Sequence, residues 1–115
     1  MVHVEDSEVW TLLEEIDKLY DSEASFEEII EHYDNAILKK PNEPYLLYQK
    51  GGFLWDTCNF EESIKLMDRV LEIDPQYILA LRMKSDCLSQ IGKYDEAKKY
   101  WDKIPAHTRK EYTNN

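Results

Sequence analysis

The stretch PYLLYQKGGFLWDTCNFEESIKLMDRVLEIDPQY, residues 44–77, recurs in altered form before and after itself at a spacing of 34 residues. Two series of equivalent positions show the step: Phe26, Phe60 and Tyr94, and Leu13, Leu47 and Leu81. A period of this length is typical of proteins built from stacked repeats, in which each unit packs against its neighbours. The repeat therefore decides the fold class before any single motif does.

Each unit contains two helical stripes of apolar residues. In residues 44–77 the first stripe is Leu47, Gly51, Leu54 and Cys58, and the second is Phe60, Ile64, Met67 and Leu71. Steps of three and four place such residues on one side of a helix. Asn59 with Glu62 predicts a capped helix start, and Asp74 before Pro75 predicts the helix end. One unit is thus a helix, a tight turn and a second antiparallel helix.

This pattern resembles the tetratricopeptide repeat family. Gly51, Phe60, Ser63 and Pro75 of the middle repeat stand at the family's small, aromatic, small and proline positions. Three repeats follow in register, 10–43, 44–77 and 78–111, within one domain spanning 1–115 and a C-terminal tail at 105–115. The resemblance implies an all-α fold, a right-handed superhelical stack of three antiparallel helix pairs (an α-solenoid). Asp17 and Ile29 depart from the two small positions of the first repeat, which predicts looser packing there.

The flanking repeats complete the six expected helices. Their ranges are 8–21 and 26–39 in the first repeat, and 77–90 and 94–103 in the last. Gly92 suits a left-handed helix cap, and Pro105 must stop or kink the sixth helix. The tail after Pro105 holds at most a turn of helix and is too short for a capping helix. We therefore expect the C-terminal end of the stack to be poorly covered.

Charge is graded along the chain. The net charge is −10, with 13 acidic and 3 basic residues in 1–43, 6 and 3 in 44–77, and 5 and 8 in 78–115. Such a surface repels a phosphate backbone, which argues against nucleic-acid binding. No apolar run is long enough for a membrane span, and the N-terminal residues lack a signal pattern, so we expect a cytoplasmic protein. Cys58 and Cys87 lack metal-ligand spacing and are expected to be reduced, buried hydrophobes.

The resemblance also implies where a partner binds, because the first helix of each family repeat lines a concave groove. The matching positions here are Thr11, Glu14, Glu15, Lys18, Asp21 and Ser22; Tyr45, Tyr48, Gln49, Gly52, Trp55 and Asp56; and Leu79, Arg82, Met83, Asp86, Ser89 and Gln90. From these we select as candidate binding residues Thr11, Glu14, Lys18, Tyr45, Tyr48, Gln49, Trp55, Leu79, Arg82, Met83 and Asp86. Tyr48 and Trp55 equally suit inter-repeat packing, whereas Tyr45, Leu79 and Met83 favour a binding surface.

The groove composition selects among partners. Family members that bind acidic chaperone tails use a clamp of lysine, asparagine and arginine, and the corresponding residues here are Glu14, Lys18, Gln49, Leu79 and Met83. Glu14 would repel a carboxylate, so a chaperone-tail adaptor is not expected. A protein or peptide with apolar anchors and basic flanks fits better.

The sequence does not indicate a catalytic site. The histidines are scattered, the neighbouring glutamates point to different helix faces, and phosphate loops, zinc spacing and nucleophile motifs are missing. We expect no enzyme activity, metal or cofactor. The alternative to a protein-interaction module or scaffold is a structural protein that stacks head to tail through acidic N-terminal and basic C-terminal ends, with weak self-association.

Overall fold

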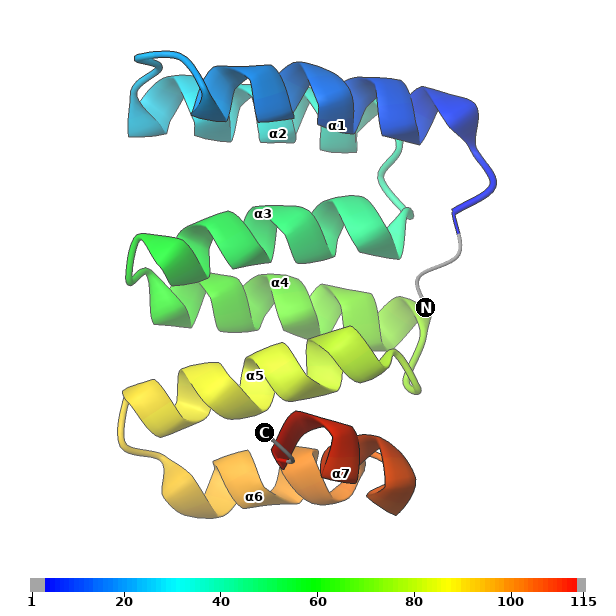
Figure 1. Cartoon of the computed structure of the whole chain (residues 1–115), viewed down its shortest axis with the longest axis vertical. Coiled ribbons are helices and arrows are strands. Elements are labelled where there is room, and N and C mark those ends of the chain that lie inside the picture. Colours follow the sequence, from blue (N-terminus) through cyan, green and yellow to red (C-terminus); the bar gives the residue numbers. More distant parts are fainter. Residues whose placement is uncertain (1–3, 114–115) are drawn as a thin grey trace.

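Helices are the only regular secondary structure in residues 4–113, the part of the chain that the computed structural model describes. They are α1 (Ser7–Tyr20), α2 (Phe26–Lys39), α3 (Pro44–Asp56), α4 (Phe60–Ile73), α5 (Ile78–Gln90), α6 (Tyr94–Asp102) and α7 (Ala106–Thr113). Figure 1 shows three helix pairs stacked along the longest axis of the molecule, with α7 lying against the last pair. The three predicted pairs are confirmed, and α7 is an addition.

Small residues let the two helices of the middle and last repeats approach closely. The Ser63 hydroxyl on α4 donates to the Gly51 carbonyl on α3 at 2.9 Å. The last repeat reverses the roles, because the Ser85 hydroxyl on α5 donates to the Ala97 carbonyl on α6 at 2.9 Å. A Cβ added at Gly51 would lie 2.4 Å from the Met67 methyl. These buried hydrogen bonds and contacts fix the spacing within each pair.

The first pair is more open. Helices α1 and α2 approach each other at fewer positions than α3 and α4 do, as expected from Asp17 and Ile29 in place of small residues. Aromatic rings fill the wider space at the junction with the middle repeat: Tyr20, Phe26 and Tyr33 surround Phe53, with ring centroids 5.3–6.2 Å from it. Wide spacing in one repeat is thus offset by large side chains between repeats.

The turns between the paired helices of the middle and last repeats use a left-handed residue. Gly92 has φ +82°, as predicted, and Cys58 occupies the equivalent position with φ +63°. Cys87 is buried, but Cys58 is exposed, which corrects the expectation for that thiol. Asn59 stands at the N-cap position of α4, as predicted, but its side chain makes no capping hydrogen bond. Its side-chain amide instead donates to the carbonyl and hydroxyl oxygens of Thr57, because the tight turn brings those acceptors closer.

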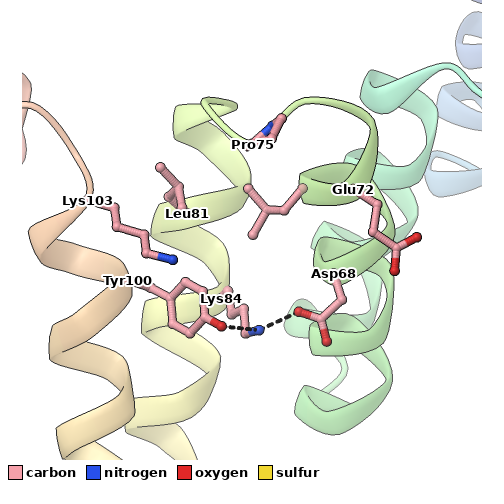
Figure 2. A pocket seen from close by; sticks show the side chains of 8 residues that line it. Asp68, Glu72, Pro75, Leu81, Lys84, Tyr100 and Lys103 are labelled. Atoms are coloured by element: carbon pink, nitrogen blue, oxygen red, sulfur yellow. Dashed lines mark hydrogen bonds and ion pairs between the residues drawn. The ribbon is translucent and has the colours of Figure 1, made fainter.

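Neighbouring repeats are joined by ion pairs that follow the 34-residue step. Lys50 on α3 binds Asp34 on α2 at 2.6 Å, and Lys84 on α5 binds Asp68 on α4. Lys84 also donates to the Tyr100 hydroxyl at 2.9 Å, and Figure 2 shows its ammonium between the two oxygens. Both lysines are largely buried, so each pair fixes the register of one repeat on the next.

Helix α7 corrects the expectation of an uncovered C-terminal end. Pro105 ends α6, and its carbonyl then accepts the Thr108 and Arg109 N–H groups, so the same residue starts a new helix. Ile104, 1% exposed, anchors the turn in the core. The α7 helix folds back so that Tyr112 meets Trp101 on α6, with ring centroids 6.1 Å apart. The tail is therefore an eight-residue helix that packs on the stack.

Candidate functional site

The first helices of the three repeats form one face of the stack, called the inner face below, and this face is hollowed. The hollow measures ≈ 510 Å³ and is lined by residues of α1, α3 and α5: Tyr20, Tyr48, Gln49, Gly52, Phe53, Trp55, Asp56 and Met83. Four of the candidate binding residues, Tyr48, Gln49, Trp55 and Met83, thus lie together. A space of this size accommodates one large side chain of a partner.

Absence of a side chain at Gly52 helps to form the hollow. A Cβ at this position would touch only the Met83 methyl, at 3.9 Å, so the wall is open in front of the α3 backbone. The hollow has rings on several sides and a carboxylate at its edge, from Asp56 at the last position of α3. Burial raises the pKa of the Tyr20 phenol, and the carboxylates of Asp56 and Asp17 act in the same direction. This end of the inner face is therefore aromatic and negative.

An aromatic row continues from the hollow along the inner face. Tyr45 stacks on Tyr48 with ring centroids 6.1 Å apart, and Trp10 of α1 lies 5.7 Å from Tyr45. On the other side Tyr77, before α5, lies 6.5 Å from Tyr48. Tyr45 and Tyr48 are half-buried against the core, and burial raises the pKa of Tyr48. Each ring supports its neighbour and keeps one side open, which suits contact with a partner at low entropic cost.

The remaining candidates on α1 and α5 are accessible. Glu14 and Lys18 are exposed on α1, and within residues 4–113 neither has an ion-pair partner. Thr11 is also exposed, but its hydroxyl donates to the Ser7 carbonyl at 3.2 Å within the same helix. Leu79 on α5 is half-buried. None of the eleven candidates is fully buried.

At the last repeat the inner face is already occupied by the chain itself. The Arg82 guanidinium lies over the Tyr112 ring, 4.2 Å from its centroid, and its Nε is 3.7 Å from Asp86. Burial raises the pKa of Asp86, while the charge of Arg82 opposes that shift. Arg82 and Asp86 thus hold each other, Arg82 is also held by α7, and each side chain stays about half exposed.

Several residues of this site escaped the sequence analysis. Tyr20 and Phe53 are not among the candidate binding residues, yet they line the hollow because the open first pair leaves room for them. Trp10 of α1 joins the aromatic row, and its indole N–H donates to the Val4 carbonyl at 3.1 Å. The role of Tyr112 depends on the path of the tail. The one sequence signal for the aromatic row was the number of aromatic residues in the first helices of the repeats.

A second hollow, of ≈ 410 Å³, lies between α4, α5 and α6 and is lined in part by Asp68, Lys84, Tyr100 and Lys103. Figure 2 shows that its central lysine points at both Asp68 and Tyr100. The Lys103 Nζ also lies over the Tyr100 ring, 4.8 Å from its centroid. The polar groups at its centre are engaged with each other, so this hollow is chiefly an inter-repeat joint.

Within residues 4–113, no group of three or more histidine, cysteine, aspartate or glutamate side chains is arranged to hold a metal ion. No helix in this part of the chain combines the length and apolar character needed to cross a membrane.

Comparisons with known proteins agree with the repeat geometry. Residues 59–114 match the family model described as tetratricopeptide repeat. Among solved structures, the chain superposes on one described as the first TPR of Spaghetti (RPAP3) bound to the HSP90 peptide SRMEEVD, with a TM-score of 0.75 and 19% identity. That match covers 100% of this chain and 87% of the other. No curated protein sequence is significantly similar to the chain. The predicted fold class and repeat resemblance are confirmed.

Proposed function

Since residues 59–114 match the tetratricopeptide repeat model and the chain superposes on a solved domain of that fold, we propose that it is a protein-interaction module whose inner face binds a partner peptide or helix. The observation that carries the proposal is the hollow of ≈ 510 Å³ with half-exposed aromatic and methionine side chains around it. Aromatic groups at a concave surface are the usual anchors of binding. The expected cytoplasmic setting and the lack of a cofactor or catalysis remain part of the proposal.

The binding mode follows from a prefolded receptor. Helix pairs held by the Ser63 and Ser85 hydrogen bonds keep the inner face in place, so most of the ordering entropy on binding falls on the partner segment. Tyr45, Tyr48 and Trp55, with Leu79 and Met83, supply apolar contact. Glu14 and the other acidic residues of α1 favour basic flanks on the partner.

The proposed partner differs from the acidic peptide of the similar structure. Glu14, Gln49 and Leu79 stand where the family's carboxylate clamp has basic or amide groups, and Glu14 is exposed without an ion-pair partner within residues 4–113. We expect the peptide SRMEEVD to show no saturable binding in isothermal titration. Binding with an affinity in the micromolar range would overturn this part of the proposal and leave the module itself intact.

The central test is a double substitution, Tyr45→Ala with Met83→Ala, compared with Tyr94→Ala. Tyr94 is an aromatic residue of α6 that is 69% exposed and lies outside the hollow. Both variants should keep the circular dichroism spectrum of a helical array. Capture of partners from an extract of the native host should be lost only with the double variant. Equal capture by both would exclude the inner face as the binding surface.

Head-to-tail self-assembly is the second candidate function. It is supported by the charge grading from −10 in residues 1–43 to +3 in 78–115 and by Leu38 of α2, which is 79% exposed. Helix α7 weakens it, because it covers part of the end that stacking requires. Sedimentation at low and high salt discriminates: an oligomer that dissociates in salt supports stacking, and a monomer in both excludes it.

A further inference from the structure

We infer that the hollow of the inner face is a subsite for one arginine side chain of the partner peptide, with its guanidinium against the rings and at the carboxylate of Asp56. This inference rests on the proposed function and adds to it the chemical identity of one anchor.

The first argument is the composition of the hollow. Tyr20, Tyr48 and Trp55 contribute rings from two helices, and Asp56 contributes the one carboxylate of the lining. Within residues 4–113, Asp56 makes no ion pair. Ring faces and an unpaired carboxylate both attract a cation, so this lining favours a positively charged group.

The second argument is the backbone around the opening. Helix α1 ends at Tyr20 and helix α3 ends at Asp56, so two helix C-termini lie at the same hollow. The C-terminus of a helix carries partial negative charge and favours a cation nearby. Asp17 also lies close enough to affect the Tyr20 phenol. The backbone and the side chains therefore favour the same sign of charge.

Competing cations of the chain do not fill this subsite. Arg82 is near enough to influence Tyr48, but its guanidinium lies on Tyr112 and faces Asp86. Lys50 of α3 is bound to Asp34 on the side of α2. Lys18 of α1 is exposed and makes no ion pair within residues 4–113, but it does not line the hollow. We therefore assign the positive group to the partner.

The planar guanidinium fits better than an ammonium. It stacks on aromatic faces and can make two parallel hydrogen bonds to one carboxylate, whereas lysine acts as a hydrated point charge. Gly52 leaves space for the aliphatic part of the side chain beside the Met83 methyl. The geometry thus favours arginine inserted along Gly52 with its head group at Asp56.

The test uses a random library of 12-residue peptides, selected on the full chain and counter-selected on the Tyr45→Ala, Met83→Ala variant. We expect the selected peptides to share an arginine at a fixed distance from an apolar residue. Replacing it by the neutral isostere citrulline should weaken binding about tenfold. Asp56→Asn should weaken the arginine peptide similarly and the citrulline peptide little, because the two changes remove one interaction.

Glu31→Gln is the matched control, since Glu31 is an exposed carboxylate of α2 outside the hollow and the change in net charge is the same. Equal weakening by Asp56→Asn and Glu31→Gln would overturn the subsite. Selected peptides without a shared arginine would also overturn it, while the proposed function would stand. A selection that yields no peptide dependent on Tyr45 and Met83 would overturn both.

Discussion

Replacing Cys58 by glycine should stabilise the protein, because this residue alone among the non-glycine residues at 4–113 has a positive φ, +63°. The turn it forms has the bonding of a left-handed helix cap: Cys58 N–H donates to the Trp55 carbonyl at 3.0 Å, and Asn59 N–H to the Leu54 carbonyl at 2.7 Å. The last repeat makes the same two bonds around Gly92. Only the residue type differs, so the two turns form an internal comparison.

The magnitude follows from two opposing terms. A left-handed backbone costs an L-residue about 1–2 kcal/mol, and Cys58→Gly removes this cost. Glycine also makes the unfolded chain more flexible, which lowers the free energy of unfolding by about 0.4–1 kcal/mol. The Cys58 thiol is exposed, so little burial is lost. The net gain in the free energy of unfolding is about 0.5–1 kcal/mol.

The reciprocal change, Gly92→Ala, should lower the free energy of unfolding by about 0.5–1 kcal/mol for the same reasons. A Cβ at Gly92 meets no atom within 4 Å, so the loss reports the backbone alone. Urea unfolding measures both variants; with a slope of about 1.5 kcal/mol/M, each midpoint should move by roughly 0.3–0.7 M.

Cys58→Ser separates the backbone effect from loss of the thiol, because serine keeps the Cβ and should leave the midpoint close to that of the wild type. If Cys58→Gly leaves the midpoint unchanged or lowers it, or if serine stabilises as much as glycine, the argument from backbone strain is wrong.

Three further predictions concern the packing of the stack. Ser63→Ala and Ser85→Ala should each lower the free energy of unfolding by about 1 kcal/mol in urea titrations, through loss of one buried hydrogen bond; a change no larger than that of Ser89→Ala would contradict this. Tyr112→Ala should lower it by about 1–2 kcal/mol and shift tryptophan emission to the red, because Trp101 and Arg82 lose a ring contact; unchanged emission would show that α7 does not cover Trp101. Burial raises the pKa values of four phenols, so as pH rises above the ordinary value of 10.0 they ionise first in the unfolded chain, and the free energy of unfolding should fall. Absorbance at 295 nm and circular dichroism should then change together. Full ionisation without loss of helix would refute this. These phenols are Tyr20, Tyr33, Tyr48 and Tyr77.

Local signals explain what the sequence predicts well. The range of α2, Phe26–Lys39, is as predicted because Ser25 caps it, its hydroxyl accepting the Glu28 N–H at 3.2 Å. The positive φ at Gly92 follows from residue type. At Cys58 the residue type gives no such signal, and the turn there is set by the surrounding helices. Asn59 is a residue type that often caps helices, but its side-chain amide donates to the Thr57 hydroxyl and does not cap α4.

Long-range packing explains what the sequence does not predict. Helix α7 depends on contacts of Tyr112 with α5 and α6, which no nearby residue reveals. The candidate site could be assigned to the first helices from the repeat register alone. Tyr20 and Phe53 could be placed at the hollow only from the distance between α1 and α2. That distance results from Asp17 and Ile29 together.

The inter-repeat ion pairs limit where the array can grow. Asp34 and Asp68 each bind a lysine 16 residues later, and Asp102, one further step of 34 along, meets Arg109 of α7 at 3.4 Å instead. A duplicate of residues 44–77 inserted after residue 77 would find a matching lysine or aspartate at both seams. A repeat added beyond α6 would first have to displace α7. Longer arrays should therefore be made by inserting repeats in the middle of the chain. In an array extended at the C-terminal end, the added repeat and α7 would compete for the same surface of the last pair.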